Sequence, residues 1–373
     1  MNTKKSSRTK NNFDDPGIGR TILNDFRETS IKKNVRSELN EIEKFYLTSE
    51  RQERIKSMGW FRRWFFRFYW IAKALFLKLS PVRRIMLFLS FIFFISVRGS
   101  TGGEGVNVST DFSPLGYTLI FIVLALELKD KLIAKDELDF GRKVQNSLLP
   151  NKDPELDGWD IHLFTSSANE VGGDLVDYIN YKSGDLGIII GDVSGKGLGA
   201  ALLMAKLQAS LKAFVRIEQS SQLIIKNLNA VFYEDVSASH FASLIYLTIF
   251  SQDKYINLIN AGHMPPLLYQ NNSVTELEHS IPALGISPKL NIVEQKIDMK
   301  QGDVLFLYSD GLSEAQNANH ELFGEERVKK LVNKNAAKSV QDFSNAILDE
   351  VKNFIGDERI ADDLSFVIIK RNF

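Results

Sequence analysis

The sequence predicts an α+β fold of layered sheets and helices for residues 151–373, and two observations support it. Short apolar runs rich in Ile, Leu, Phe and Tyr follow one another after Trp159, as expected for strands. The helical patterns also occur in clusters, whereas strands and helices alternate regularly in a doubly wound fold. We therefore expect a layered sandwich, preceded by N-terminal segments of different composition.

The elements of this sandwich are expected in a definite order. Strands are predicted at 186–190, 241–250, 255–259, 266–269, 304–308 and 364–370, with a hairpin turn at 251–254. Helices are predicted at 199–216, 221–232, 325–333 and 340–354, where apolar residues recur at helical spacing.

Composition excludes several classes of protein. The chain has no cysteine, so disulfides, thiolate zinc sites and a cysteine nucleophile are excluded. Its zero net charge hides an asymmetry, because residues 1–84 hold 20 basic and 9 acidic side chains while residues 85–373 hold 26 and 37. Nucleic-acid binding needs a basic face, so no nucleic-acid partner is expected for the acidic part. The first 30 residues lack an apolar stretch, so no cleavable signal peptide is expected.

The N-terminal part divides into a polar tail at 1–50 and a basic, aromatic segment at 51–84. The second segment has ten basic residues and one acid, Glu53. Its aromatic residues are Trp60, Phe61, Trp64, Phe65, Phe66, Phe68, Tyr69 and Trp70. This mixture is typical of a helix in the headgroup region of a membrane, which makes membrane lipids an expected partner. A soluble basic helix docked on a protein is the alternative.

Two apolar runs, at 85–97 and 115–126, predict a two-helix membrane hairpin over 85–126. Thirteen helical residues span about 20 Å, less than the roughly 30 Å of hydrocarbon in a bilayer, although Arg84 and Arg98 could extend the first run by snorkelling. The basic flank at Arg83 and Arg84 predicts that both termini and the C-terminal domain are cytoplasmic, which makes the cytoplasmic membrane the expected location. The alternative is a pair of buried helices in a soluble regulatory domain.

The second apolar run continues into a helical linker at 127–150. An imperfect apolar stripe marks its face, formed by Leu128, Leu132, Leu138, Val144 and Leu148. Pro150 ends the helix. Such a helix could transmit a signal to the downstream domain or form a homodimer.

Four aspartates, Asp174, Asp192, Asp310 and Asp362, indicate the chemistry. Each has glycine or a second acid close by, and three adjoin an apolar run that predicts a buried strand. Carboxylates are hard ligands suited to Mg²⁺ or Mn²⁺, and two such ions about 4 Å apart can activate water and hold a phosphate. Helix caps and turns are the alternative, because aspartate beside glycine is common in both.

Other patterns in the sequence offer weaker candidates for a functional site. The segment 191–197 follows a strand and opens a helix, but its spacing departs from a phosphate-binding loop and Gly197 stands where Ser or Thr is required. His263 could act as a catalytic acid or could shape its loop. No G-x-S-x-G elbow supports a serine hydrolase.

Taken together, the motifs carry a family resemblance. They are, in order, 144–150 (VQNSLLP), 171–174 (VGGD), 191–197 (GDVSGKG) with 200–202 (AAL), 260–263 (NAGH), 283–286 (ALGI), 308–312 (YSDGL) with Glu314 and Ala315, 323–324 (FG) and 362–363 (DD). This ordered set resembles the metal-dependent protein phosphatase (PPM) family, in its bacterial SpoIIE/RsbU-like branch, over residues 137–371.

The resemblance implies an αββα sandwich with two Mn²⁺ or Mg²⁺ ions at one edge. It implies that Asp192 bridges both ions, that the Val193 carbonyl completes one, and that Asp310 and Asp362 bind the other. Asp174 would contact the first ion directly or through water, and Asp192 and Asp310 would carry the catalysis. Supporting positions behind these ligands are implied for Gly173, Asp177, Gly311 and Asp363.

The resemblance also implies a reaction and a partner. A bridging hydroxide would attack phosphoserine or phosphothreonine without a covalent enzyme intermediate. The substrate would be a phosphorylated STAS-domain antagonist of an anti-sigma factor, and the 127–150 helix would be a regulatory linker. A phosphoprotein-binding module without turnover remains an alternative. A two-metal nuclease is a further one, disfavoured by the negative balance of residues 85–373.

Overall fold

The computed structural model divides the chain into two compact units, Met1–Asp130 and Lys131–Phe373. The boundary falls inside helix α6 (Ser113–Leu148). The structure describes residues 54–55, 58–95, 99–103, 106–110, 112–218, 220–235, 240–251, 253, 255–277, 281–358 and 360–372. The predicted polar tail at 1–50 lies outside the described residues.

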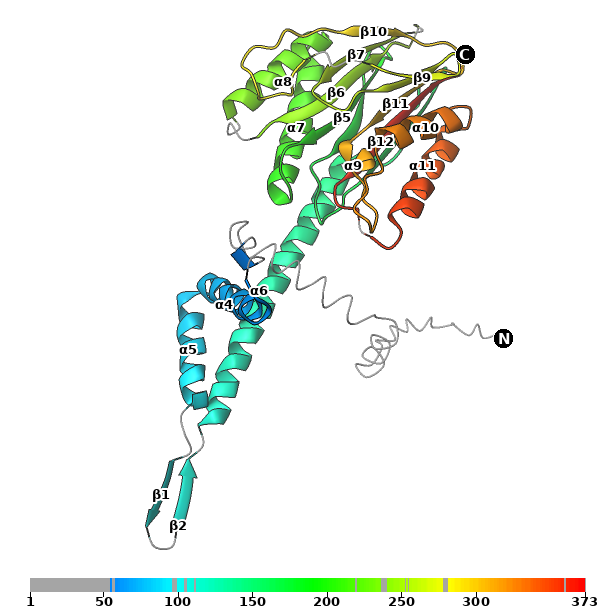
Figure 1. Cartoon of the computed structure of the whole chain (residues 1–373). Helices are drawn as coiled ribbons and strands as arrows, with labels where there is room; N and C mark the ends of the chain where they lie inside the picture. Colours follow the sequence, from blue (N-terminus) through cyan, green and yellow to red (C-terminus); the bar gives the residue numbers. More distant parts are fainter. Residues whose placement is uncertain are drawn as a thin grey trace, which may run out of the picture. The chain divides into compact units, whose positions relative to one another are not determined.

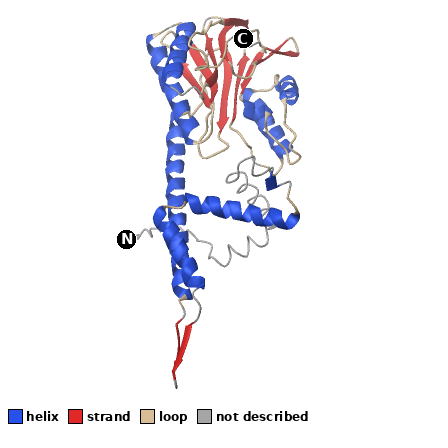
Figure 2. Ribbon diagram, turned by 60° about the vertical axis from the view of Figure 1, so that its left-hand side comes forward, coloured by secondary structure: helices blue, strands red, loops and turns tan. Residues whose placement is uncertain are grey.

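The second unit contains two five-stranded antiparallel sheets, drawn in red in Figure 2. One has the order β10 (Gln295–Asp298), β7 (Tyr255–Ala261), β6 (Ala242–Ile249), β5 (Leu186–Val193), β4 (Leu175–Asn180). The other has the order β3 (Trp159–Ser166), β12 (Leu364–Arg371), β11 (Val304–Tyr308), β8 (Leu267–Gln270), β9 (Ser273–Glu276). Inward-facing residues such as Ile188, Leu247, Leu305 and Val367 form a core cluster shared by the two sheets.

Helices cover the outer face of each sheet (Figure 1). Helices α7 (Leu198–Ile217) and α8 (Ser221–Asp235) share a core with β4–β7, and α10 (Glu325–Asn335) and α11 (Val340–Ile355) share another with β8, β11 and β12. The three cores alternate with the layers of secondary structure, so the architecture is helix, sheet, sheet, helix. The expected αββα sandwich is confirmed.

The predicted elements agree with the observed ones to within a few residues at most boundaries. The strand predicted at 304–308 coincides with β11. Strands β3 and β4, in which polar residues interrupt the apolar ones, were not predicted, and neither was the short helix α9 (Asp310–Ser313). Strands β9 and β10 were also missed. Both strands have only four residues and are mostly exposed or half-buried, so neither contains an apolar run that could have marked it.

The first unit contains helices α4 (Trp60–Lys78), α5 (Pro81–Ile95) and the start of α6. Between α5 and α6 the structure has a small antiparallel ribbon of β1 (Gly99–Gly103) and β2 (Val106–Thr110), which the sequence did not predict. The guanidinium of Arg83 joins α5 to α6, donating to Glu127 Oε1 at 2.7 Å and to Asp130 Oδ2 at 2.6 Å.

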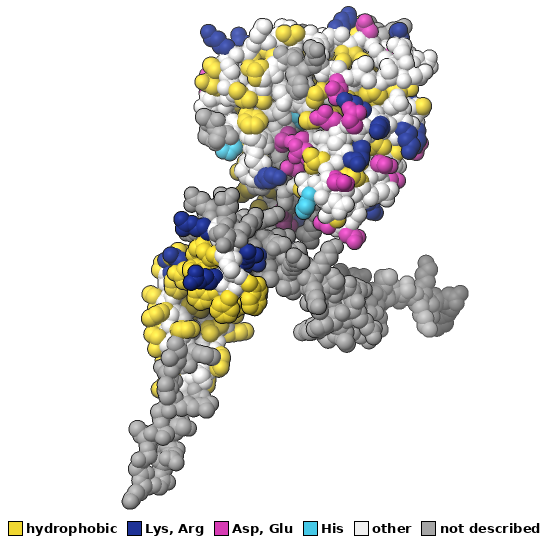
Figure 3. All heavy atoms as spheres, viewed as in Figure 1, with side chains coloured by type: hydrophobic (Ala, Val, Ile, Leu, Met, Phe, Trp, Pro, Cys, Tyr) yellow, Lys and Arg dark blue, Asp and Glu magenta, His cyan; other side chains and the backbone are white. Residues whose placement is uncertain are grey.

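The aromatic side chains of α4 are largely exposed. Trp60 is 83% exposed and Phe68 is 67% exposed, and no residue of this helix is buried. Figure 3 shows the same region as hydrophobic side chains interleaved with Lys and Arg. The helix predicted from the basic, aromatic segment therefore forms and leaves its apolar face uncovered within the described chain.

Among the described helices, α7 alone is long and apolar enough to cross a membrane by length and composition. Its Met204, Leu207 and Leu211 are fully buried in the core of the second unit, so α7 is a core helix. Helix α5 has 15 residues, which corresponds to about 22 Å. The two helices of the predicted hairpin are present, and their spanning of a bilayer stays a prediction.

Candidate metal centre

One sheet brings Asp174 and Asp192 together. Leu175, the first residue of β4, pairs with Gly191 of β5 in an antiparallel register. Asp174 precedes that pair and Asp192 follows it, so the two residues lie opposite each other where β4 begins and β5 ends. The apolar residues of β5 are buried on both faces, which fixes the register that holds the two carboxylates in place.

The other sheet brings Asp310 to Asp362 and Asp363 in the same way. Tyr308, the last residue of β11, pairs with Phe366 of β12. Asp310 therefore follows β11 at the edge where the two aspartates lead into β12. A hydrogen bond from Ser309 N to Ser365 O, at 2.9 Å, continues the pairing beyond the strand end.

The two pairs meet at one edge of the sandwich, where they affect one another electrostatically. Burial raises the pKa of Asp174 well above its ordinary value, and the neighbouring charge of Asp192 raises it further. Burial also raises the pKa of Asp192 to about 7, with added repulsion from Asp310 and Asp362. The pKa of Asp310 is raised by burial and by Glu314. These acids therefore share one partly desolvated, negatively charged site.

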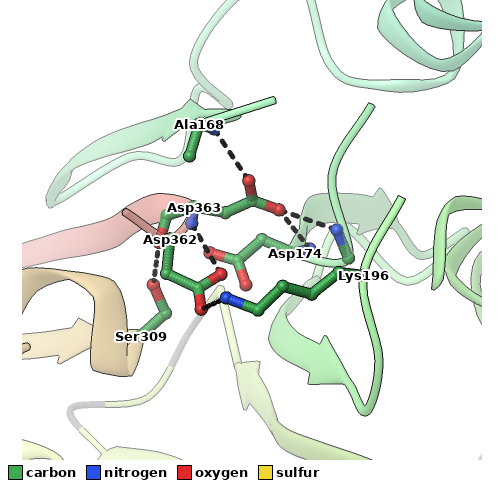
Figure 4. Close-up of polar contacts among 7 residues, drawn as sticks. Ala168, Asp174, Lys196, Ser309, Asp362 and Asp363 are labelled. Carbon is green, nitrogen blue, oxygen red and sulfur yellow. Dashed lines mark hydrogen bonds and ion pairs between the residues drawn. The ribbon is translucent and has the colours of Figure 1, made fainter. Parts of the chain in front are cut away.

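Asp363 holds the loops of this site together. Its carboxylate accepts hydrogen bonds from the backbone N–H groups of Ala168 at 2.9 Å and Gly173 at 2.7 Å (Figure 4). Its backbone carbonyl accepts one from the Ser309 hydroxyl at 3.2 Å. Asp363 thus ties the loop before β4 to the loop after β11.

Three glycines allow the backbone to approach closely at this edge. A Cβ on Gly311 would lie 2.0 Å from the carbonyl oxygen of Asp363, and one on Gly172 would lie 2.2 Å from Asp363 Oδ2. A Cβ on Gly173 would lie 3.1 Å from both Asp192 Oδ1 and the Val193 carbonyl oxygen. Gly173 and Gly311, selected from the sequence, therefore pack against residues of the site, and Val193 directs its carbonyl toward Gly173.

Lys196 also reaches the site, although sequence reasoning assigned it no role. Its Nζ donates to Asp362 Oδ2 at 2.8 Å (Figure 4). The hydrogen bond to Asp362 raises the pKa of Lys196. Its position directly after the Asp192 segment, between two glycines, was the available signal.

Within the part of the chain that the structure describes, no three acidic or imidazole side chains are arranged to hold a metal ion. The proximity of the aspartates is nevertheless clear from their mutual effects on pKa. In this structure Asp362 is paired with Lys196, and the carboxylate of Asp363 accepts hydrogen bonds from backbone N–H groups. One observation fits a cation directly: Asp174 Oδ2 is buried and has no hydrogen-bond partner. An all-carboxylate set with such an oxygen suits Mg²⁺ or Mn²⁺.

Asp177 lies apart from this cluster. It is 3% exposed, and its Oδ2 accepts from Lys212 Nζ and from Gln208 Nε2, each at 2.6 Å. The same Gln208 amide donates to the carbonyl of Leu148 at the end of α6. The structure thus places Asp177 between α7 and the linker helix.

The linker helix also contacts the loop that carries Asp174. Gln145 is 7% exposed, donates to the Gly172 carbonyl at 2.7 Å and accepts from the Gly172 N–H at 3.1 Å. This paired contact joins the predicted linker to the site.

His263 is buried behind the site. Its Nδ1 lies 2.9 Å from the hydroxyl of Ser243, which in turn donates to the carbonyl of Asp192 at 3.4 Å. Its backbone N–H donates to Asn260 Oδ1 at 2.8 Å, closing the turn. These contacts agree with the loop-shaping alternative.

Solved structures share this fold. The PP2C domain of SiaA from Pseudomonas aeruginosa superposes with a TM-score of 0.58 at 17% identity, covering 65% of this chain and 99% of that one. The RsbU and RsbW domains of a Mycobacterium tuberculosis protein give a TM-score of 0.52 at 22% identity, covering 59% of this chain and 61% of that one. These structures place the chain in the PP2C-type phosphatase fold.

Sequence relatives narrow this class. Phosphoserine phosphatase RsbU of Bacillus subtilis is 28% identical over 64% of this chain and 70% of its own length. Phosphoserine phosphatase RsbP of the same organism is 31% identical over 49% of this chain and 46% of its own length. The family described as Stage II sporulation protein E (SpoIIE) matches residues 182–372. The chain belongs to the SpoIIE family.

Proposed function

We propose that this chain hydrolyses phosphoserine or phosphothreonine on a protein, using two Mn²⁺ or Mg²⁺ ions at the edge of the sandwich. Asp174, Asp192, Asp310, Asp362 and the Val193 carbonyl would hold the ions. The observation that carries the proposal is the meeting of Asp174 and Asp192 with the aspartates at 310, 362 and 363 at one edge of the sandwich. Burial there, with added repulsion from Asp310 and Asp362, raises the pKa of Asp192 to about 7. Bound cations would relieve the repulsion that burial imposes on these carboxylates.

The protein's own residues would position the reaction. When bound, the ions would supply Lewis acidity and activate water for in-line attack on phosphorus. Asp363 would keep the loops of Asp174 and Asp310 at a fixed separation, since its carboxylate and carbonyl are bonded to both. The glycines at 172, 173 and 311 would let the loops of the site pack directly against Asp363 and Asp192.

The proposed substrate is a phosphorylated STAS-domain protein that antagonises an anti-sigma factor. The support is the similarity to phosphoserine phosphatases RsbU and RsbP and the family resemblance of the ordered motifs. The chain spans about half the length of RsbP, so this substrate is proposed for the matched domain.

Control by the N-terminal part would pass through the 127–150 helix. Two features support this proposal: Gln145 contacts the loop of Asp174, and several apolar side chains of α6 stay exposed in the single chain. Leu128 is 58% exposed and Leu132 is 53% exposed, as a homodimer seam would require before association.

We also propose attachment to the cytoplasmic membrane, with both termini and the phosphatase domain in the cytoplasm. The exposed aromatic face of α4 and the absence of acidic residues from Trp60 to Arg84 support it. Helix α5, with exposed Phe88 and Phe91, would enter the bilayer with the start of α6.

The test is an assay of the full-length chain in detergent with Mn²⁺ and a phosphoserine protein, beside Asp310→Ala. We expect Mn²⁺-dependent release of phosphate by the wild type and its near-complete loss in the variant. Binding of the phosphoprotein without release of phosphate would favour the binding-module alternative. Cleavage of DNA or RNA would favour the nuclease.

A further inference from the structure

Lys196 is an exposed cation at the edge of an acidic site. Among the described residues, it is the one Lys or Arg side chain in an ion pair with the aspartates at positions 174, 192, 310, 362 and 363. Its side chain is 66% exposed, so the ammonium group lies on the solvent side of the site. A phosphate group entering from solvent would meet it before reaching the buried carboxylates.

The ammonium group retains donor capacity. A lysine side chain has three N–H donors, and Lys196 uses one of them, to Asp362 Oδ2 at 2.8 Å. The remaining donors face solvent. The hydrogen bond to Asp362 holds the side chain over the site, which reduces the conformational entropy that would be lost on binding an anion.

Two glycines in unusual backbone conformations flank Lys196 and direct its side chain to the site. Gly195 and Gly197 have φ values of +111° and +68°, a region that other residues rarely adopt. A Cβ at either position would meet no atom within 4 Å, so backbone conformation, and not crowding, requires glycine there. The turn lets Lys196, only a few residues beyond Asp192, reach across to Asp362 of the other sheet.

The charges of the site favour an additional cation near the substrate phosphate. Two divalent ions would only neutralise the four aspartate ligands, and Asp363 adds a further negative charge nearby. A phosphate monoester carries up to two negative charges and would therefore gain from an additional cation.

We propose that Lys196 binds the phosphoryl group of the substrate and of the phosphate product while remaining anchored beside Asp362. The inference rests on the proposed phosphatase function. The alternative is that Lys196 only neutralises or orients Asp362, in which case its removal would change metal binding and not phosphate binding.

The test compares full-length wild type with Lys196→Met, Lys196→Arg and a control, Lys226→Met, which removes the same charge from the exposed face of α8. Three quantities are measured in detergent: Mn²⁺ affinity, affinity of the Mn²⁺-loaded protein for inorganic phosphate by calorimetry, and kcat and KM for p-nitrophenyl phosphate. We expect Lys196→Met to weaken phosphate binding and raise KM by about tenfold or more, the usual effect of losing a charge-assisted hydrogen bond. Mn²⁺ affinity and kcat should change by less than about threefold.

The controls separate the possible outcomes. Lys196→Arg should retain most phosphate affinity, and Lys226→Met should match wild type. Equal phosphate affinity in wild type and Lys196→Met, or a loss confined to Mn²⁺ affinity, would overturn the inference, as would a wild type that binds no phosphate. Calorimetry needs no turnover, so a wild type that binds phosphate but hydrolyses nothing would defeat the proposed function while leaving the role of Lys196 measurable.

Discussion

The two units of this chain handle charge in opposite ways. In the second unit, acidic side chains are gathered at the edge of two sheets, where burial raises the pKa of Asp174 and Asp192. In the first unit, basic and aromatic side chains lie on exposed helices, and Trp60 is 83% exposed. Grouping like charges under burial is unfavourable for folding, whereas exposed arginines cost little.

This difference indicates which kind of partner would stabilise each unit. The acidic edge is unfavourable by itself and would gain from a bound cation, as the proposed metal centre requires. The basic face is stable in water but leaves large aromatic surfaces uncovered, so it gains from an apolar, anionic surface such as a membrane. Four predictions test the contrast, in order of decreasing effect.

The largest effect is expected at the acidic edge, for Asp192→Asn. This change removes the charge proposed to bridge both ions while keeping the shape of the side chain. We expect phosphatase activity to fall by about 10³-fold or more, because the proposed mechanism depends on the ions. The measurement is Mn²⁺-dependent hydrolysis of p-nitrophenyl phosphate. Asp160→Asn, on the outer end of β3, is the control and should keep full activity.

The second prediction concerns the close approach of the loops. Gly311→Ala would place a Cβ 2.0 Å from the carbonyl oxygen of Asp363, which is backbone and cannot turn aside. We expect a loss of about 3 kcal/mol or more in the free energy of unfolding, together with loss of activity. Chemical denaturation measures it. Gly199→Ala, where a Cβ meets no atom within 4 Å, should have little effect.

The third prediction is a pH dependence of stability in the presence of a chelator. The pKa of Asp192 is about 7 in the fold against an ordinary value of 3.8, so the fold favours the protonated form. Its contribution to stability is complete below about pH 4 and is lost as the pH rises through about 7. The Tm in EDTA should therefore fall by several degrees between pH 5.5 and 8, and Mn²⁺ should raise it more at pH 8. A Tm in Asp192→Asn that falls as steeply as in wild type would contradict this origin.

The smallest effect is expected for the aromatic face of α4, because the hairpin helices would also anchor the chain. Trp64→Ala removes a ring that is 63% exposed and stacks on Phe68. We expect binding to vesicles containing phosphatidylglycerol to weaken about threefold in high salt, measured by flotation. Phe66→Ala, at a less exposed position, should change it less. Complete release of the wild type by salt would leave only peripheral attachment.

Much of the fold could be predicted from the sequence, because most of its strands and helices have a local pattern of apolar residues. Strand β11 has an unbroken apolar run, and α11 has a regular apolar spacing, so both were found with nearly correct bounds. The ribbon of β1 and β2 was not found, because glycine, serine and threonine predict a loop, whereas the strands exist through pairing with each other.

The site was predictable in part for the same reason. The aspartates were found because each has glycine or a second acid close by and three adjoin an apolar run, and their ordered motifs gave the family. The family resemblance also implied a supporting position for Asp177 behind the metal ligands. An odd separation along a strand turns side chains to opposite faces, and Asp177 contacts Lys212 and Gln208 instead.

The sequence by itself determined the residue types and their order. Acids stand near glycines or other acids at strand ends, and arginines among aromatic residues precede them in the chain. Only the tertiary structure decided which of these side chains meet. The pairing of Leu175 with Gly191 and of Tyr308 with Phe366, and the stacking of the two sheets, set those distances. Strand register depends on burial of side chains from distant parts of the chain. The position of Lys196 between two glycines after Asp192 therefore could not show that it would pair with Asp362.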